Sequence, residues 1–189
     1  MKCGEGTKAL RLKRTIVLVG MMGSGKSAIG RALSARLQVP FQDSDAAIEE
    51  AAQDTIADIF ARDGEAFFRR RESEVIKRLL DGPPAVLSTG GGAFLAARNR
   101  DIIAEAGAAV WLDAPLRLLW ERVRHKDTRP LLRTADPLAT LTALFEERTP
   151  IYALATLRLS VRPNNSIDET TQSLIQLLLE HPDLLEAAT

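Results

Sequence analysis

A glycine-rich stretch near the N-terminus has the residue types and spacing that bind nucleotide phosphates. Residues 20 to 27 are Gly-Met-Met-Gly-Ser-Gly-Lys-Ser, which fits the P-loop pattern. Glycines let the main chain approach a phosphate, and amide N–H groups at the start of the next helix attract its oxygens. Lys26 adds a positive charge at the terminal phosphates, and the hydroxyl of Ser27 can contact Mg²⁺. The stretch therefore predicts a site for a nucleoside triphosphate with Mg²⁺; a glycine-rich turn before an ordinary helix is the alternative.

Two carboxylates, Asp43 and Asp45, could work beside that nucleotide. They follow a short apolar segment, and residues two apart on an extended chain share a side. One carboxylate could support the metal ion through its waters, and the other could orient and deprotonate an attacking hydroxyl. Both could instead be N-caps of the following helix. Their spacing does not separate these interpretations, but the nearby P-loop favours the functional one.

Basic residues gather in two further segments. Residues 69–71 are consecutive arginines on a predicted helix over 65–80, and consecutive helical residues point about 100° apart. They cannot all face one pocket; such a run is usually solvated, although one of them could bind a carboxylate or phosphate. Residues 125–136 are polar and rich in basic side chains, which indicates either a flap that closes over phosphates or an exposed charged loop.

Three consecutive glycines, residues 90–92, follow a predicted buried strand at 85–88. Three glycines in a row cost conformational entropy, so we expect a ligand to approach the backbone there. The strand lacks the terminal Asp that is common in ATPases and GTPases. This disfavours those classes and leaves Asp43 as the expected metal-supporting residue.

Predicted strands alternate with predicted helices along the whole chain, which indicates an α/β fold with a parallel sheet covered on both faces. Ligands in such folds bind beyond the carboxyl ends of the strands, where the motifs above lie. The five strands are expected at 15–19, 39–43, 85–88, 109–112 and 157–161, and helices at 27–37, 45–52, 56–62, 65–80, 95–106, 115–124, 137–155 and 167–179.

The composition indicates one globular domain. The chain has 189 residues, with 25 Lys and Arg balanced by 25 Asp and Glu, which argues against a general nucleic-acid binder. Cys3 is the single cysteine, which fits a reducing cytoplasm, and no apolar run is long enough to span a bilayer. We expect a flexible basic tail at residues 1–14 and a single domain at 15–189.

Taken in order, the motifs resemble those of shikimate kinases. Besides the P-loop, the matching segments are Asp43-Ser-Asp45, Ile56-Ala-Asp-Ile-Phe60, Asp63-Gly-Glu-Ala-Phe-Phe-Arg69, Gly90-Gly-Gly92, Thr128-Arg-Pro-Leu-Leu132 and Glu147-Arg-Thr-Pro-Ile-Tyr152. The resemblance implies a nucleoside-monophosphate-kinase-like three-layer sandwich, with a five-stranded parallel sheet flanked by helices and a mobile lid at about 125–136. It also implies transfer of the ATP γ-phosphate to the 3-hydroxyl of shikimate, giving shikimate 3-phosphate.

The same resemblance assigns roles to particular residues. It implies catalytic roles for Lys26, Asp45 and Arg129, and Mg²⁺ contacts from Ser27 and Asp43. It implies ATP contacts from Gly23, Ser24, Gly25, Lys26, Ser27, Ala28, Arg122 and Arg129. It implies shikimate contacts from Asp45, Phe60, Phe68, Arg69, Gly91, Gly92 and Arg148. We expect a monomer whose partners are ATP and shikimate, with no nucleic-acid or membrane partner.

Without the resemblance, the residues indicate a small P-loop phosphotransferase for a small anionic polyol. One rival is another small-molecule kinase, such as a gluconate kinase. The rival from a different class is a nucleotide-dependent regulatory module. A second substrate pocket built from Asp45, Arg69 and Arg148 would discriminate, because a regulatory module has no need of one.

Overall fold

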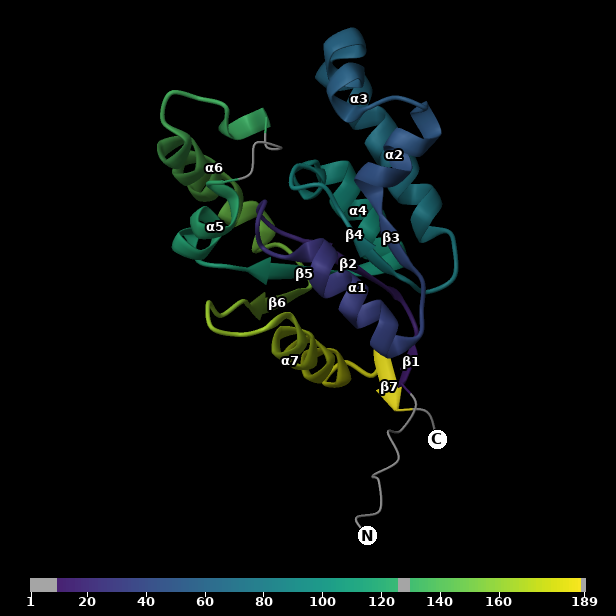
Figure 1. The fold of residues 1–189 in the computed structure, drawn as a ribbon. Helices are drawn as coiled ribbons and strands as arrows, with labels where there is room; N and C mark the ends of the chain where they lie inside the picture. The colour runs from purple at the N-terminus through teal and green to yellow at the C-terminus, as the bar shows by residue number, and fades with distance from the viewer. Residues whose placement is uncertain (1–9, 126–129, 188–189) are drawn as a thin grey trace.

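A five-stranded parallel sheet forms the centre of the protein in the computed structural model, which describes residues 10–125 and 130–187 (Figure 1). The strand order is β3-β4-β2-β5-β6, so the strand that precedes the P-loop lies in the middle. This confirms the expected α/β fold. The strands are β2 (Thr15–Val19), β3 (Phe41–Asp43), β4 (Val86–Ser88), β5 (Gly107–Asp113) and β6 (Leu157–Ser160).

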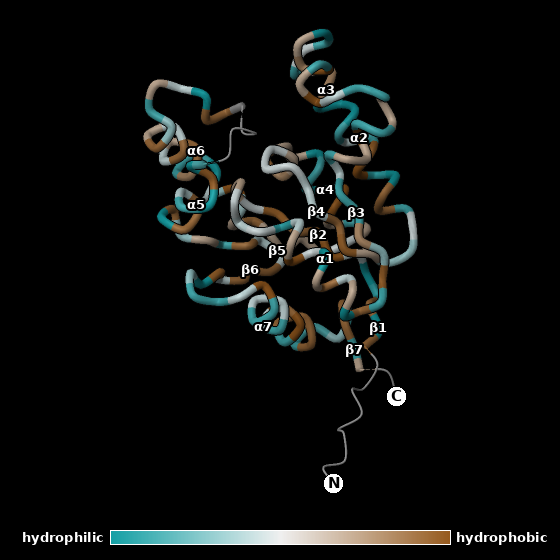
Figure 2. The backbone as a smooth tube through the Cα atoms, in the orientation of Figure 1, coloured by the Kyte–Doolittle hydropathy of each residue, from teal (hydrophilic) through white to brown (hydrophobic). Residues whose placement is uncertain are grey.

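The central strand β2 is buried along its whole length. Its sequence, Thr-Ile-Val-Leu-Val, is the continuous apolar run typical of a parallel strand covered on both faces. Val17 pairs with Leu87 of β4 on one side and with Ala109 of β5 on the other. Apolar residues concentrate in these inner strands, and polar residues in the outer helices (Figure 2). Because β2 is held by strands on both sides, the position of its carboxyl end, where the P-loop begins, is fixed within the sheet.

Helices flank the sheet, and two groups of them extend beyond it (Figure 1). One group is α2 with the first half of α3, and the other is α5, α6 and the 3₁₀ helix η2. Helix α3 is interrupted at Gly64, where φ is 79°, which confirms the predicted break. The helices are α1 (Lys26–Leu37), α2 (Ser44–Ala52), α3 (Ile56–Leu80), η1 (Ala93–Leu95), α4 (Ala97–Ala106), α5 (Leu116–Val123), η2 (Pro130–Leu132), α6 (Pro137–Tyr152) and α7 (Ile167–Leu179).

The prediction of a flexible tail is wrong for residues 10–14. Strand β1 (Leu10–Leu12) pairs antiparallel with β7 (Leu185–Ala187), a strand that the sequence did not predict. Lys13 also forms an ion pair with Glu186, with 2.5 Å between Nζ and Oε2. Each strand has three residues, too few for a visible pattern, and the partner lies at the other end of the chain. Residues 1–9 lie outside the described part.

In the expected lid, Leu132 is buried, whereas residues 131 and 133–136 are exposed. Residues 130–132 form η2, in which Leu132 is buried, and η2 contacts α6. Asp136 caps α6 by accepting a hydrogen bond from the amide of Ala139 at 2.9 Å. Arg129, expected in the lid, lies outside the described residues.

None of the helices in residues 10–125 and 130–187 combines the length and the apolar character that crossing a lipid bilayer requires.

Candidate functional site

The P-loop joins β2 to α1 in the conformation that its glycines predict. Gly20, Gly23 and Gly25 have φ values of 136°, 82° and 100°, which residues with a Cβ rarely adopt. No side chain caps the start of α1, so its first amides are available to an anion. The ammonium group of Lys26 donates to the carbonyl of Gly20 at 2.8 Å and to that of Met21 at 3.0 Å. The loop therefore presents positive groups on its exposed side.

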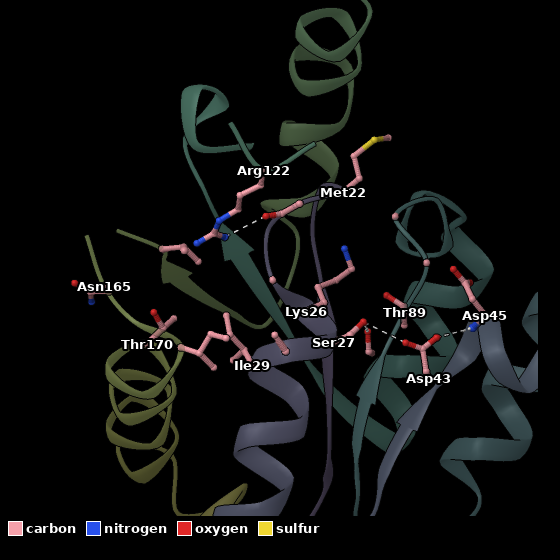
Figure 3. A pocket seen from close by; sticks show the side chains of 18 of the residues that line it. Met22, Lys26, Ser27, Ile29, Asp43, Asp45, Thr89, Arg122, Asn165 and Thr170 are labelled. Atoms are coloured by element: carbon pink, nitrogen blue, oxygen red, sulfur yellow. Dashed lines mark hydrogen bonds between the residues drawn. The ribbon is translucent and has the colours of Figure 1, made fainter. Parts of the chain in front are cut away.

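A cavity of about 600 Å³ opens beside this loop (Figure 3). Its walls are the P-loop, the carboxyl ends of β3 and β4, and Arg122 of α5, with the segment around the start of α7 at the far end. Arg122 donates to the carbonyl oxygens of Gly23 at 3.1 Å and Ser24 at 3.4 Å, which ties α5 to the P-loop. The volume suits a nucleotide-sized ligand.

Three oxygen-bearing side chains meet at one corner of the cavity. The hydroxyl of Ser27 donates to Oδ2 of Asp43 at 3.3 Å and lies 3.2 Å from the hydroxyl of Ser88. Oxygen donors of this kind suit a Mg²⁺ ion whose coordination is completed by water and phosphate oxygens. No group of three or more His, Cys, Asp or Glu side chains is placed to hold a metal ion in the described part of the chain.

Asp43 is the N-cap that one of the two interpretations of its sequence position predicts. Its Oδ1 accepts hydrogen bonds from the amides of Asp45 at 3.1 Å and Ala46 at 3.4 Å, so it is the N-cap of α2. Its Oδ2 remains directed at Ser27. Ser88 was not predicted, although its place at the end of β4, where other P-loop proteins carry an Asp, was a usable signal.

Asp45 lies in the first turn of α2, half-buried in the cavity wall. Burial raises the pKa of its carboxyl group above the ordinary 3.8, and the charge of Asp43 raises it further. Lys26 opposes this rise. A carboxylate that binds its proton more readily than usual, beside a phosphate-binding loop, is suited to accept a proton from a hydroxyl group.

Among the three consecutive arginines, only Arg69 turns inward. It is half-buried, whereas Arg70 and Arg71 are exposed. Its Nη1 donates to Oε2 of Glu72 at 2.9 Å, and Glu72 is 1% exposed. Burial raises the pKa of Glu72, and the hydrogen bond from Arg69 opposes the rise. Sequence reasoning assigned no function to Glu72, although a charge on the apolar side of a helix was a signal.

The triglycine loop, Gly90 to Gly92, leaves room for the protein's own side chains. A Cβ atom on Gly92 would lie 2.7 Å from Nη2 of Arg69, and the carboxylate of Asp45 lies against Gly90. The sequence suggested that a ligand approaches this backbone. The side chains of Asp45 and Arg69 approach it at Gly90 and Gly92.

Arg148 lies on α6 and is also half-buried. Its Nε is buried and has no hydrogen-bond acceptor among the described residues, so an added anionic group could satisfy it. The rings of Phe60 and Phe68 pack at a tilt of 32° with centroids 4.5 Å apart; Phe68 is 3% exposed, whereas Phe60 is half-buried. Phe60 therefore presents more ring surface than Phe68.

The structure gathers some predicted residues around the cavity and leaves others beside it. Ser24 is fully buried and does not line the cavity. Asn165 and Thr170, which were not predicted, line its far end; no motif marks them in the sequence. The predicted residues in the lining are Gly23, Gly25, Lys26, Ser27, Ala28, Asp43, Asp45, Gly91 and Arg122, and those outside it are Phe60, Phe68, Arg69, Gly92 and Arg148.

Comparison with known proteins gives a consistent result. The family model described as shikimate kinase matches residues 22–179. A shikimate kinase from Ruegeria pomeroyi is 60% identical over 178 residues, covering 94% of this chain and 91% of the relative. One from Paramagnetospirillum magneticum is 52% identical over 161 residues, covering 85% and 82%.

Solved structures agree with the sequence comparisons. A shikimate kinase from Acinetobacter baumannii in complex with shikimate superposes with a TM-score of 0.81 at 36% identity, covering 88% of this chain and 93% of that one. A gluconokinase from Sinorhizobium meliloti gives 0.58 at 20% identity, covering 91% and 97%, which shows likeness of fold alone.

Proposed function

Because this chain belongs to the shikimate kinase family, we propose that it transfers the γ-phosphate of ATP to the 3-hydroxyl of shikimate. The observation that carries the proposal is the convergence of two kinds of group on one loop. Asp45 of the P-loop cavity lies against Gly90 at one end of the triglycine loop, and Arg69 lies against Gly92 at its other end. A phosphate donor and a carboxylate-bearing acceptor can therefore meet there.

The nucleotide half of the reaction depends on the P-loop. Its amides and the ammonium of Lys26 would bind the ATP phosphates and stabilise charge on the transferred group. Arg122 would contact the nucleotide from α5 while it braces the loop.

The acceptor half depends on charge. Arg69 and Arg148 would bind the shikimate carboxylate, since a planar guanidinium matches a carboxylate with two parallel hydrogen bonds. Asp45 would accept hydrogen bonds from the acceptor hydroxyls and take the proton of the attacking one. The pocket would be completed by backbone groups of Gly91 and Gly92 and by the ring of Phe60. Phe68 packs against that ring.

The metal ion is proposed to be Mg²⁺. The hydroxyl of Ser27 would bind it directly and Asp43 would hold it through water, which fits the oxygen donors at that corner. A bound Mg²⁺ would neutralise charge on the β- and γ-phosphates. As further proposals, the chain acts as a single domain that includes strand β1, and the enzyme is a monomer in the cytoplasm.

A steady-state assay would test the function. ADP formation from ATP is measured with shikimate, with gluconate and with no acceptor. We expect strong stimulation by shikimate alone, and no stimulation in a folded Lys26→Ala variant. Stimulation by gluconate would favour the rival kinase, and binding of ATP without turnover on either acceptor would favour a regulatory module.

A further inference from the structure

Tyr152 is the last residue of α6, and its hydroxyl reaches the triglycine loop. The hydroxyl donates to the carbonyl oxygen of Gly91 at 2.5 Å. The side chain is 1% exposed, and its ring stacks on Trp111 of β5 with centroids 6.4 Å apart. The contact therefore joins the helix that follows the expected lid to the loop that follows β4.

The same hydroxyl is linked to Arg148, one helical turn earlier. Residues four apart lie on one face of a helix. The positive charge of Arg148 lowers the pKa of Tyr152 against the larger, opposite effect of burial, so the guanidinium lies near the phenol. The buried hydroxyl thus bonds to Gly91 and lies on the same face of α6 as Arg148, and both Gly91 and Arg148 are proposed to bind the acceptor.

Gly91 also borders the P-loop. A Cβ atom on Gly91 would lie 3.8 Å from the carbonyl oxygen of Gly20 and 3.8 Å from the amide of Met22. It would lie 3.9 Å from the hydroxyl of Tyr152. The triglycine loop therefore lies between the P-loop and Tyr152. On the side that faces α6, Gly91 is held by the hydrogen bond from the Tyr152 hydroxyl.

The phenol remains a hydrogen-bond donor at any pH near neutrality. Burial raises the pKa of Tyr152 to about 12, although Arg148 opposes the rise. Packing against Trp111 requires only the aromatic ring. Burying a hydroxyl lowers the stability of the folded protein unless the hydroxyl is hydrogen-bonded. The hydroxyl of Tyr152 therefore indicates a role beyond the packing that a phenylalanine ring would provide.

We propose that Tyr152 is a positioning residue for the acceptor, whose hydroxyl holds Gly91 at a fixed place relative to Arg148. The inference rests on the proposed function, because it assigns acceptor binding to these two groups. Tyr152 acts through them and does not touch the reacting atoms. Losing the hydroxyl should therefore weaken binding of the acceptor far more than binding of ATP.

The variant Tyr152→Phe tests this because it keeps the ring, its burial and its stacking while it removes the donor. We expect the KM and the calorimetric Kd for shikimate to rise roughly tenfold, the scale of one unsatisfied buried polar group. The KM for ATP should stay within about twofold of wild type. The matched control is Thr149→Val, which removes a neighbouring α6 hydroxyl that bonds to the carbonyl of Phe145 at 2.6 Å. It should change neither KM.

Amide hydrogen exchange of the ligand-free protein supplies a readout that needs no acceptor. Exchange at residues 91–93 should be several-fold faster in Tyr152→Phe and unchanged in Thr149→Val. Unchanged exchange in Tyr152→Phe, or equal losses for shikimate and ATP, would overturn the inference. Wild-type protein that fails to phosphorylate shikimate would overturn the proposed function instead, while the exchange result still tests the inference.

Discussion

The carboxylate of Asp45 fills the space that a side chain at Gly90 would need. A Cβ atom on Gly90 would lie 2.5 Å from Oδ1 of Asp45, closer than real Cβ contacts come. None of the three glycines at 90–92 has a positive φ, so at Gly90 and Gly92 the lack of a side chain, and not backbone freedom, explains why glycine is there. Asp45 and the loop therefore depend on each other for position.

Gly90→Ala should displace the carboxylate of Asp45 without unfolding the protein. We expect kcat/KM for shikimate to fall about a hundredfold, the scale of a displacement of about 1 Å at a reacting group. Binding of ATP, measured by calorimetry, should persist. Gly82→Ala is the control, because its Cβ would meet only the carbonyl of Leu79 at 3.5 Å. Normal turnover in Gly90→Ala would contradict the assignment of Asp45.

Asp45→Asn should lose turnover because an amide can donate a hydrogen bond but cannot take the proton. We expect kcat to fall by about a thousandfold and the affinity for shikimate to fall as well. Titration with Mg-ATP should give near-normal affinity. If the variant bound shikimate normally and failed only on Mg²⁺, the roles of Asp43 and Asp45 would be reversed.

The raised pKa of Asp45 predicts a pH-dependent stability difference. Below 3.8, folded and unfolded chains both hold the proton on Asp45, so ionisation costs nothing. As the pH rises past the folded-state pKa, the folded protein must ionise a buried carboxyl group and loses stability relative to the unfolded chain. The ligand-free Asp45→Asn variant should therefore have a higher Tm than wild type at neutral pH. That gap should shrink in acid; a Tm difference independent of pH would contradict the assignment.

Asp43→Asn separates capping from metal support. Asn is as good an N-cap as Asp, so the variant should keep its Tm. Loss of the carboxylate facing Ser27 should raise the Mg²⁺ concentration needed for half-maximal activity. Asp43→Ala loses the cap too and should be less stable by about 1 kcal/mol. An unchanged Mg²⁺ requirement in Asp43→Asn would remove Asp43 from the metal site.

Arg129→Ala tests the lid prediction at a position outside the described residues. A lid arginine that acts on developing phosphate charge should lower kcat by roughly a hundredfold or more, with a smaller effect on shikimate affinity. Kinetics over both substrates would measure the two effects. A change confined to the KM for shikimate would place Arg129 in the acceptor pocket.

The sequence by itself determined the features that depend on local spacing. The P-loop glycines needed φ values that only glycine adopts readily, so their pattern predicted the loop. Regular alternation of apolar segments predicted the five parallel strands, because each strand buries both faces. Thr55 and Gly64 marked a helix start and a break that the structure confirms, since a cap and a positive φ are properties of single residues.

Only the tertiary structure decided the relationships between distant segments. Helical geometry did not show which of the three arginines turns inward; the resemblance implied Arg69, and its ion pair with buried Glu72 and the space at Gly92 show that it does. The pairing of β1 with β7 and the bond from Tyr152 to Gly91 join residues far apart in sequence. Such contacts form because packing brings two distant segments together. The residue pattern within either segment does not show which other segment it contacts.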